Sequence, residues 1–234
     1  MKIFLTKLIL GRPVKDEVSI SPLSKVIKNI KAIWNNEHHD DIGIEKLARL
    51  GLAVSQLFFP GTYIKQIFGR NNVSYRELSV DVFVLFKIAF PLMLIKFNLY
   101  HNPILFALLI WFMFETVSYI STLIFASDIF SRPRSYRRSM LLLFINYIEI
   151  VLDFAVIYSA GNYLNKPFHH WFDSIYFSFT TSASVGFGDF IPVTPLGKFL
   201  VSMQSILFLV FVVMFINFFS GKVENKGYFG DKQS

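Results

Sequence analysis

The chain has 234 residues, of which 53% are hydrophobic and 18% aromatic, and its mean hydropathy of +0.49 is unusually high for a soluble domain. This composition excludes an ordinary soluble protein and predicts an integral membrane protein whose apolar segments cross a bilayer as helices. The net charge of +7 is explained more simply by basic segments on the cytoplasmic side than by nucleic-acid binding, and the lack of cysteine excludes disulfides and thiolate metal sites.

The first 75 residues are mixed in character and rich in basic side chains. In residues 20–34 apolar side chains recur at about helical spacing, with lysines on the other side, which predicts a basic amphipathic helix. Residues 44–68 are apolar enough to contact lipid, but Pro60, Gly61 and several basic side chains interrupt them. We expect an interfacial helix on the cytoplasmic face here, and a segment that enters the membrane is the alternative.

Four hydrophobic segments follow, each long enough to cross a bilayer. They cover residues 80–99, 103–128, 139–160 and 197–220. The loop between the second and third carries four arginines, which the positive-inside rule assigns to the cytoplasm. We therefore expect a multi-pass protein of the cell membrane with both termini in the cytoplasm. Its predicted parts are a cytoplasmic region 1–75, a transmembrane hairpin 76–130, a basic linker 131–138, a two-span module 139–221 and a short tail 222–234.

Four charged side chains fall within the predicted spans, namely Lys87, Glu115, Glu149 and Asp153. A rise of 1.5 Å per residue places Lys87 and Glu149 closest in depth, so we expect these two to pair, with Glu115 as a poorer partner. An unpaired charge at mid-bilayer is costly, which favours such pairing. The face of the third span that carries Glu149 and Asp153 is predicted to pack on the first two spans; a pH-linked gate is the alternative role.

A short aromatic stretch and a glycine-containing run lie between the third and fourth spans. Residues 169–182 are too few to cross the membrane, so we predict a re-entrant helix, with Pro167 suited to its first turn. The chain must then return through "SVGFGD", residues 184–189, in extended form. Irregular backbone at membrane depth is tolerated only where protein or water satisfies it, and a bound cation is the obvious partner for exposed carbonyls.

The alternation of glycine in this run has a conformational reason. Gly186 and Gly188 alternate with Val185 and Phe187, and glycine adopts left-handed backbone angles without strain. Such alternation aims successive carbonyls to one side, and the Ser184 hydroxyl adds another oxygen to the row. One row cannot surround an ion, and the chain holds a single copy, so a ring of copies is required. Four-fold closure matches the carbonyl filters of potassium channels.

Residues 172–198, "FDSIYFSFTTSASVGFGDFIPVTPLGK", resemble the pore loop of the tetrameric potassium channel family. Residues 139–221 are similar in layout to the pore module of that family, which has an outer helix, a pore helix, a filter and an inner helix. Residues 1–138 resemble no family that we can name. The resemblance implies an all-α membrane fold of about four transmembrane helices plus a re-entrant helix, assembled as a four-fold homotetramer. It also implies K⁺ as the permeant ion, with a conduction path from Ser184 through Val185, Gly186 and Phe187 to Gly188.

The run departs from the usual pattern of the family at two places. Ser184 stands where threonine is usual and Phe187 where tyrosine is usual, as in the similar filter of ether-à-go-go-related channels. Ser184 keeps the hydroxyl ligand, whereas Phe187 lacks the phenolic group that braces the filter. Tyr176 is placed to hydrogen-bond Asp189 in compensation, and Thr180 belongs with these two as filter support. A filter prone to inactivation is the expected result.

The control of opening is less visible in the sequence. The last span has no glycine before Gly221, so hinge bending near Phe208 is not expected. Phe208 and Phe215 could narrow the pore, and Asn217 suits a water-filled cavity; the alternative is that these rings face lipid or the outer helix. No span carries arginine at every third position, so a voltage sensor is not expected. Control is expected through residues 1–75 or an unidentified regulator that binds them.

The sequence therefore predicts a passive, potassium-selective channel subunit in contact with membrane lipid. A weakly selective cation channel is the first alternative, because Ser184 and Phe187 soften the filter. A potassium uptake transporter subunit is the second alternative, although such chains usually carry several dissimilar loops. No enzyme activity, cofactor or nucleic-acid partner is expected, because no acid–base or nucleophile constellation is evident.

Overall fold

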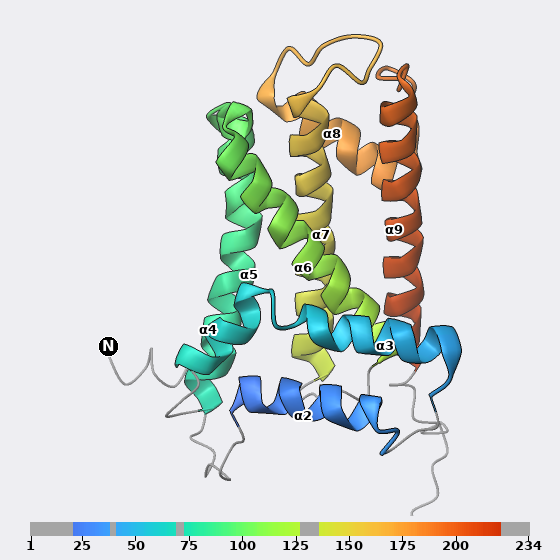
Figure 1. Ribbon diagram of the computed structural model, residues 1–234. Coiled ribbons are helices and arrows are strands. Elements are labelled where there is room, and N and C mark those ends of the chain that lie inside the picture. Colours follow the sequence, from blue (N-terminus) through green and yellow to red (C-terminus); the bar gives the residue numbers. More distant parts are fainter. Residues whose placement is uncertain (1–20, 38–40, 69–72, 127–135, 221–234) are drawn as a thin grey trace, which may run out of the picture.

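The computed structural model describes residues 21–37, 41–68, 73–126 and 136–220, and the named elements in these residues are all helices (Figure 1). In chain order they are α2 (Pro22–Trp34), α3 (Gly43–Ser55), α4 (Pro60–Phe68), α5 (Val73–Lys96), the 3₁₀ turn η1 (Leu99–His101), α6 (Pro103–Phe125), α7 (Tyr136–Ala160), α8 (Trp171–Ser182) and α9 (Pro195–Ser220). The predicted tail 222–234 and most of the linker 131–138 lie outside the described residues.

Four of the described helices are long and apolar enough to cross a membrane. These candidate spans are Tyr75–Lys96, Pro103–Phe125, Arg138–Ala160 and Pro195–Asn217. The expected all-α membrane fold with about four spans is therefore confirmed. The first span begins earlier than the predicted residue 80. Two acidic side chains, Glu77 and Asp81, lie near the start of this span, and Arg138 of α7 offsets their charges. The Nη2 atom of Arg138 lies 2.6 Å from Asp81 Oδ1, and its Nη1 atom lies 4.0 Å from Glu77 Oε2.

The turn between α5 and α6 is closed by two asparagines. Asn98 adopts a left-handed backbone with φ of 54°, a conformation that asparagine tolerates better than most residues. Asn102 caps α6, because its side-chain oxygen accepts hydrogen bonds from the backbone nitrogens of Ile104 and Leu105, at 2.9 and 3.3 Å. Pro103 then occupies the first helical position, where a missing N–H costs nothing. The two spans therefore form an antiparallel hairpin.

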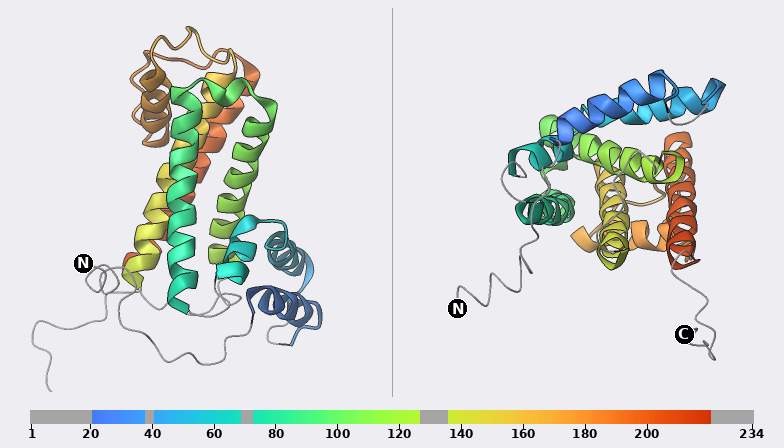
Figure 2. Two further views of the ribbon diagram at one scale, coloured as in Figure 1. Left: turned by 90° about the vertical axis from the view of Figure 1, so that its left-hand side faces the viewer. Right: turned by 90° about the horizontal axis from the view of Figure 1, so that it is seen from below.

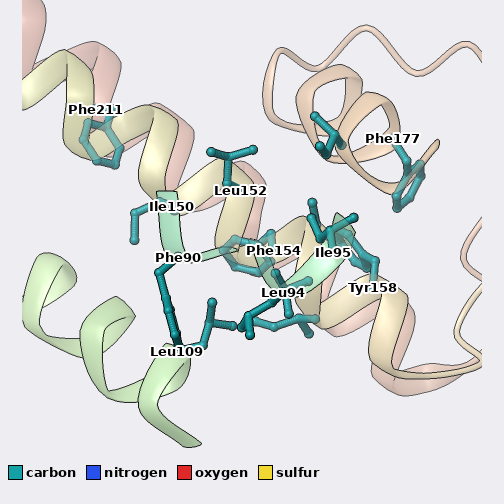
Figure 3. Close-up of a cluster of buried hydrophobic side chains, with 14 of the residues drawn as sticks. Phe90, Leu94, Ile95, Leu109, Ile150, Leu152, Phe154, Tyr158, Phe177 and Phe211 are labelled. Atoms are coloured by element: carbon teal, nitrogen blue, oxygen red, sulfur yellow. The ribbon is translucent and has the colours of Figure 1, made fainter. Parts of the chain in front are cut away.

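Helix α7 is the centre of the bundle. The span that it contains is 61% buried, against 17% for each of the spans in α6 and α9, because α5, α6, α8 and α9 all pack on it. The main hydrophobic core collects side chains from five helices around it (Figure 3). Those labelled are Phe90, Leu94 and Ile95 of α5, Leu109 of α6, Ile150, Leu152, Phe154 and Tyr158 of α7, Phe177 of α8 and Phe211 of α9.

The three N-terminal helices lie across one end of the bundle, opposite the end that carries α8 (Figures 1 and 2). Ser21 caps α2 by accepting a hydrogen bond from the Ser24 backbone nitrogen. The predicted helix over 44–68 is two helices, α3 and α4, because the chain breaks before Pro60. With 13 and 9 residues, each of these helices is too short to cross a bilayer.

Helix α4 is attached to the bundle through a carboxylate of α6. The Gly61 backbone nitrogen donates a hydrogen bond to Glu115 Oε1 at 2.9 Å. This contact places the Glu115 carboxylate at the N-terminal end of α4, where the helix dipole favours an anion. A Cβ atom at Gly61 would lie 2.5 Å from the same oxygen, so this glycine is required by close approach.

Replacing Gly61 by Ala is expected to weaken this attachment. The added methyl group displaces the Glu115 carboxylate and removes its bond to the backbone, at a cost of about 1–3 kcal/mol. Hydrogen exchange of the full chain should show amide protection in residues 60–68 falling by about tenfold or more. Gly51→Ala is the matched control, because a Cβ atom there meets no described atom within 4 Å. Equal protection in both variants would show that the contact contributes nothing to docking.

Candidate ion-conducting site

Helix α8 begins at a capping box. The His170 side chain accepts a hydrogen bond from the Phe172 backbone nitrogen, while Asp173 accepts 2.9 Å bonds from the backbone nitrogens of His169 and His170. The His170 backbone bond is the first cause that lowers the pKa of Asp173, which favours its charged form. The helix therefore starts at Trp171. The expectation that Pro167 lies in its first turn was wrong, because the capping box at His170 sets the start of the helix.

The chain that follows α8 alternates between two backbone conformations. Ser184, Gly186 and Gly188 have φ of 56°, 60° and 81°, so every second residue is left-handed. A Cβ atom at either glycine would meet no described atom within 4 Å. The glycines are therefore needed for their backbone angles, since space alone would admit a side chain. Ser184 shares this conformation without being glycine, which the sequence did not indicate.

Backbone hydrogen bonds fix the start of this run to the end of α8. The nitrogen of Val185 donates to the Thr180 carbonyl at 2.9 Å, and that of Ser184 donates to the Thr181 carbonyl at 3.0 Å. Beyond these bonds, the side chains from Ser184 to Asp189 are all exposed in the single chain. The run is thus a short extended segment, anchored at one end and uncovered along its length.

Tyr176 of α8 supports the run through one aromatic ring and one acid that belong to the run. The rings of Tyr176 and Phe187 stack with centroids 6.2 Å apart and planes 8° apart. Desolvation first, then the nearby Asp189 carboxylate, raise the pKa of Tyr176, so its hydroxyl is a neutral donor at ordinary pH. Phe187 therefore contributes stacking in place of a phenolic hydrogen bond.

Behind α8, buried polar side chains connect it to both neighbouring helices. Gln204 of α9 donates from Nε2 to the Ser178 carbonyl and hydroxyl oxygens at 2.9 and 2.8 Å. Its own oxygen accepts a 2.8 Å bond from the Tyr158 hydroxyl, and Ser178 donates to the Val151 carbonyl. Burial of all three side chains at 1% exposure or less makes these bonds costly to break. Sequence reasoning missed this network, whose only signal was Ser178 and Gln204 within apolar helices.

A second contact holds the end of α8 that adjoins the extended run. The hydroxyls of Tyr147 on α7 and Ser182 lie 2.9 Å apart, and Ser182 is 1% exposed. Because Ser182 precedes the left-handed Ser184 by two residues, this bond ties the start of the run to α7. Hydrogen bonds at Ser178 and Ser182 therefore hold the C-terminal half of α8 to α7 and α9.

The segment after the run is clamped by the loop between α7 and α8. Asn165 donates from its backbone to the Ile191 carbonyl at 2.9 Å, and its side-chain oxygen accepts from the Ile191 nitrogen at 3.0 Å. The Val193 nitrogen donates to the Tyr163 carbonyl at 3.0 Å, within the isolated bridge that pairs Leu164 with Pro192. This clamp closes the run into a loop with two fixed ends.

The candidate gate residues of α9 do not gather on one uncovered face. The ring of Phe208 lies 6.1 Å from that of Tyr147, and the ring of Phe215 lies 6.3 Å from that of Phe144, both on α7. These contacts agree with the alternative that the rings pack on the outer helix. Asn217 is exposed in the single chain. Predicting their packing required knowing which face α7 covers, and the uniformly apolar sequence of α9 does not reveal it.

The intramembrane charges form a bridge across three helices. Lys87 Nζ lies 3.1 Å from Glu149 Oε1, and Thr116 of α6 accepts from Lys87 while donating to Glu149 at 2.8 Å. Lys87 and Glu149 are 5% and 0% exposed, so the predicted pairing and the predicted packing of this face are confirmed.

The other two intramembrane acids lie outside this bridge. Glu115 accepts a hydrogen bond from the Gly61 backbone nitrogen instead, which corrects its expected role. Asp153 is 2% exposed, and its Oδ2 atom has no hydrogen-bond partner among the described residues.

A comparison with protein families matches residues 142–225 to a family model described as "Ion channel". The match covers α8, the alternating run, α9 and all but the first six residues of α7, and it leaves out α2 to α6. No curated protein and no solved structure matches the chain. The family match supports an ion channel function for the module of α7, α8 and α9, and the four candidate spans identify a membrane protein.

Proposed function

We propose that the protein is a potassium-selective channel subunit that conducts K⁺ passively through residues 184–188. The observation that supports this best is the alternation of left-handed backbone at Ser184, Gly186 and Gly188, placed directly after a short helix inside a channel-type module. Alternating handedness lets consecutive carbonyls face one side, and rings of backbone carbonyls replace the hydration shell of K⁺ in such filters. The Ser184 hydroxyl and the carbonyls of Val185, Gly186 and Phe187 are the proposed ligands.

The proposed assembly is a homotetramer, because one row of oxygens cannot enclose an ion. The apolar surface of the module supports it, since α8 and α9 expose many large side chains in the single chain. They are Trp171, Phe172 and Phe179 of α8 and Leu196, Phe199, Met203, Ile206, Leu209, Val213 and Ile216 of α9. Neighbouring copies and lipid would cover these side chains. In this assembly the α8 end faces outward and α2 to α4 lie in the cytoplasm, as the arginine-rich linker favours.

A weakly selective cation channel is the second candidate function. It is favoured by Phe187, whose ring stacks on Tyr176 but cannot donate a hydrogen bond to α8. A filter braced on one side only holds its oxygens less firmly, which would reduce discrimination between K⁺ and Na⁺. A potassium uptake transporter is the third candidate, and its transport would saturate with a turnover typical of carriers.

Ion flux into vesicles tests the proposal. The full chain is reconstituted in vesicles loaded with K⁺, and uptake of radioactive rubidium is followed while external K⁺ or Na⁺ competes. We expect K⁺ to suppress uptake and Na⁺ to have little effect. Equal suppression by both ions would favour the weakly selective channel, and native mass spectrometry should give four times 27.1 kDa for the assembly.

Replacing Tyr176 by Phe is expected to hasten the loss of current during sustained opening. The change keeps the ring stacked on Phe187 but removes the hydroxyl that interacts with the Asp189 carboxylate. Loss of an interaction worth about as much as one hydrogen bond, about 0.5–1.5 kcal/mol, should speed inactivation by about twofold to tenfold. Tyr63→Phe, which removes an exposed hydroxyl bonded to the Leu57 carbonyl, is the matched control in patch-clamp recordings. Unchanged inactivation in Y176F would show that this interaction does not brace the filter.

A further inference from the structure

Helix α3 presents one apolar face that none of the described residues covers. Ile44, Leu47, Ala48 and Gly51 follow one another after three, one and three residues, so each lies three or four positions from another, which places them along one side of the helix. All four are exposed, Ile44 by 86% and Leu47 by 71%. We call these four residues the α3 face. An apolar row of this kind indicates a contact with a partner or a membrane.

The opposite side of α3 is fully engaged, and this fixes the direction of the α3 face. Arg49 Nε lies 3.1 Å from Asp41 Oδ2, with both side chains buried. Lys46 donates to the Trp34 carbonyl at 2.9 Å, and Ala53 packs with Ile33 of α2 and Ala126 after α6. The basic side chains of α3 are thus turned onto its own hairpin. The helix cannot rotate to hide its apolar row without breaking the buried ion pair.

The position of α3 places this row next to the lipid-facing surface of the spans. Seen from below, α2 and α3 run along one side of the bundle beside α6 (Figure 2). The span in α6 is only 17% buried, so its outer surface meets lipid when it crosses a membrane. Other exposed apolar side chains near the same end are Phe58, between α3 and α4, and Ile67 and Phe68 of α4. The α3 face therefore lies at the same end of the bundle as these exposed apolar side chains, on a helix that runs beside α6.

The basic side chains near α3 favour an anionic lipid surface as the partner of the α3 face. On α2, which packs beneath α3, Lys28 and Lys31 are exposed. Lysines that flank an apolar helix face attract acidic lipid headgroups within about a Debye length of 8–10 Å. Another protein surface would need to complement both a flat apolar row and the adjacent spans.

From this we infer that the α3 face inserts into the membrane leaflet at the α2–α4 end of the bundle, at the boundary between anionic headgroups and acyl chains. The helix lies in the plane of that leaflet while the four spans cross it. In the proposed orientation this is the cytoplasmic leaflet. The inference rests on α2 to α6, which the channel family match leaves out, so it stands or fails independently of the ion that the module conducts.

Spin labelling tests the inference directly, because the chain has no native cysteine to interfere. Leu47→Cys and Ala48→Cys are labelled singly with a nitroxide in the full chain, and Ser24→Cys at an exposed position of α2 serves as the control. The proteins are reconstituted in vesicles of phosphatidylcholine and phosphatidylglycerol. Collision rates are then measured with oxygen, which concentrates in lipid, and with a nickel chelate, which stays in water.

The expected result is a ratio of oxygen to nickel collisions that is severalfold higher at positions 47 and 48 than at position 24. The ratio should fall when phosphatidylglycerol is omitted, because the attraction of Lys28 and Lys31 is then lost. Nickel access at 47 equal to that at 24 would overturn the inference. Low collision rates with both reagents, together with spin–spin broadening between labels, would show instead that a second copy covers the α3 face.

Discussion

Replacing Gly186 by Ala is expected to abolish potassium flux while leaving the assembly intact. Gly186 has φ of 60°, and an L-residue in this conformation costs about 1–2 kcal/mol. A Cβ atom there meets no described atom within 4 Å, so the methyl group itself causes no clash within the chain. The backbone is instead driven toward negative φ, which turns a carbonyl away from the proposed ion path. In the proposed homotetramer, four copies of the change act on one path.

Rubidium uptake measures the effect, and a loss of about a hundredfold or more is expected because one misdirected carbonyl per chain removes a whole ring of ligands. Gly51→Ala adds the same methyl group in a helix where a Cβ atom is free of described contacts, so its flux should equal that of the unaltered protein. Full flux through G186A, with the tetramer preserved, would show that residues 184–188 are not the conduction path.

Replacing Lys87 by Met is expected to destabilise the protein by about 3–5 kcal/mol. The substitution leaves Glu149, which is 0% exposed, without the cation that lies 3.1 Å from its carboxylate. Thr116 still donates to Glu149, but one neutral hydrogen bond does not replace an ion pair in a site shielded from water. The loss is expected as a lower midpoint of thermal unfolding and a reduced yield of tetramer in mild detergent.

Two further variants separate charge from packing. Adding Glu149→Gln to K87M removes the unpaired negative charge of Glu149, so the double variant should recover part of the stability lost in K87M. Lys96→Met changes the same residue type at the exposed end of α5 and should have little effect. If K87M and K96M unfold at the same temperature, the buried bridge does not hold the hairpin to α7.

The sequence predicted the features whose physical cause is local. Segment length and hydropathy gave the four spans, since about 20 apolar residues are needed to cross a bilayer. The pairing of Lys87 with Glu149 followed from matching their depths along two helices. The alternation around Gly186 and Gly188 followed from glycine's freedom in left-handed backbone.

Features that depend on how distant segments meet were not predictable. Pro60 and Gly61 looked like a simple helix break, yet Gly61 is needed because Glu115, 54 residues later, approaches its backbone. The start of α8 was placed too early because the capping role of His170 is unusual for histidine. The network around Gln204 was missed because one polar side chain in an apolar helix does not reveal the neighbour it faces.

The reversal potential in mixed ions tests the central claim most directly. Purified protein is recorded in a planar bilayer with K⁺ on one side and Na⁺ on the other. The proposed filter predicts unitary currents that reverse close to the equilibrium potential of K⁺. A reversal potential near zero, which indicates equal passage of both ions, would contradict potassium selectivity through residues 184–188.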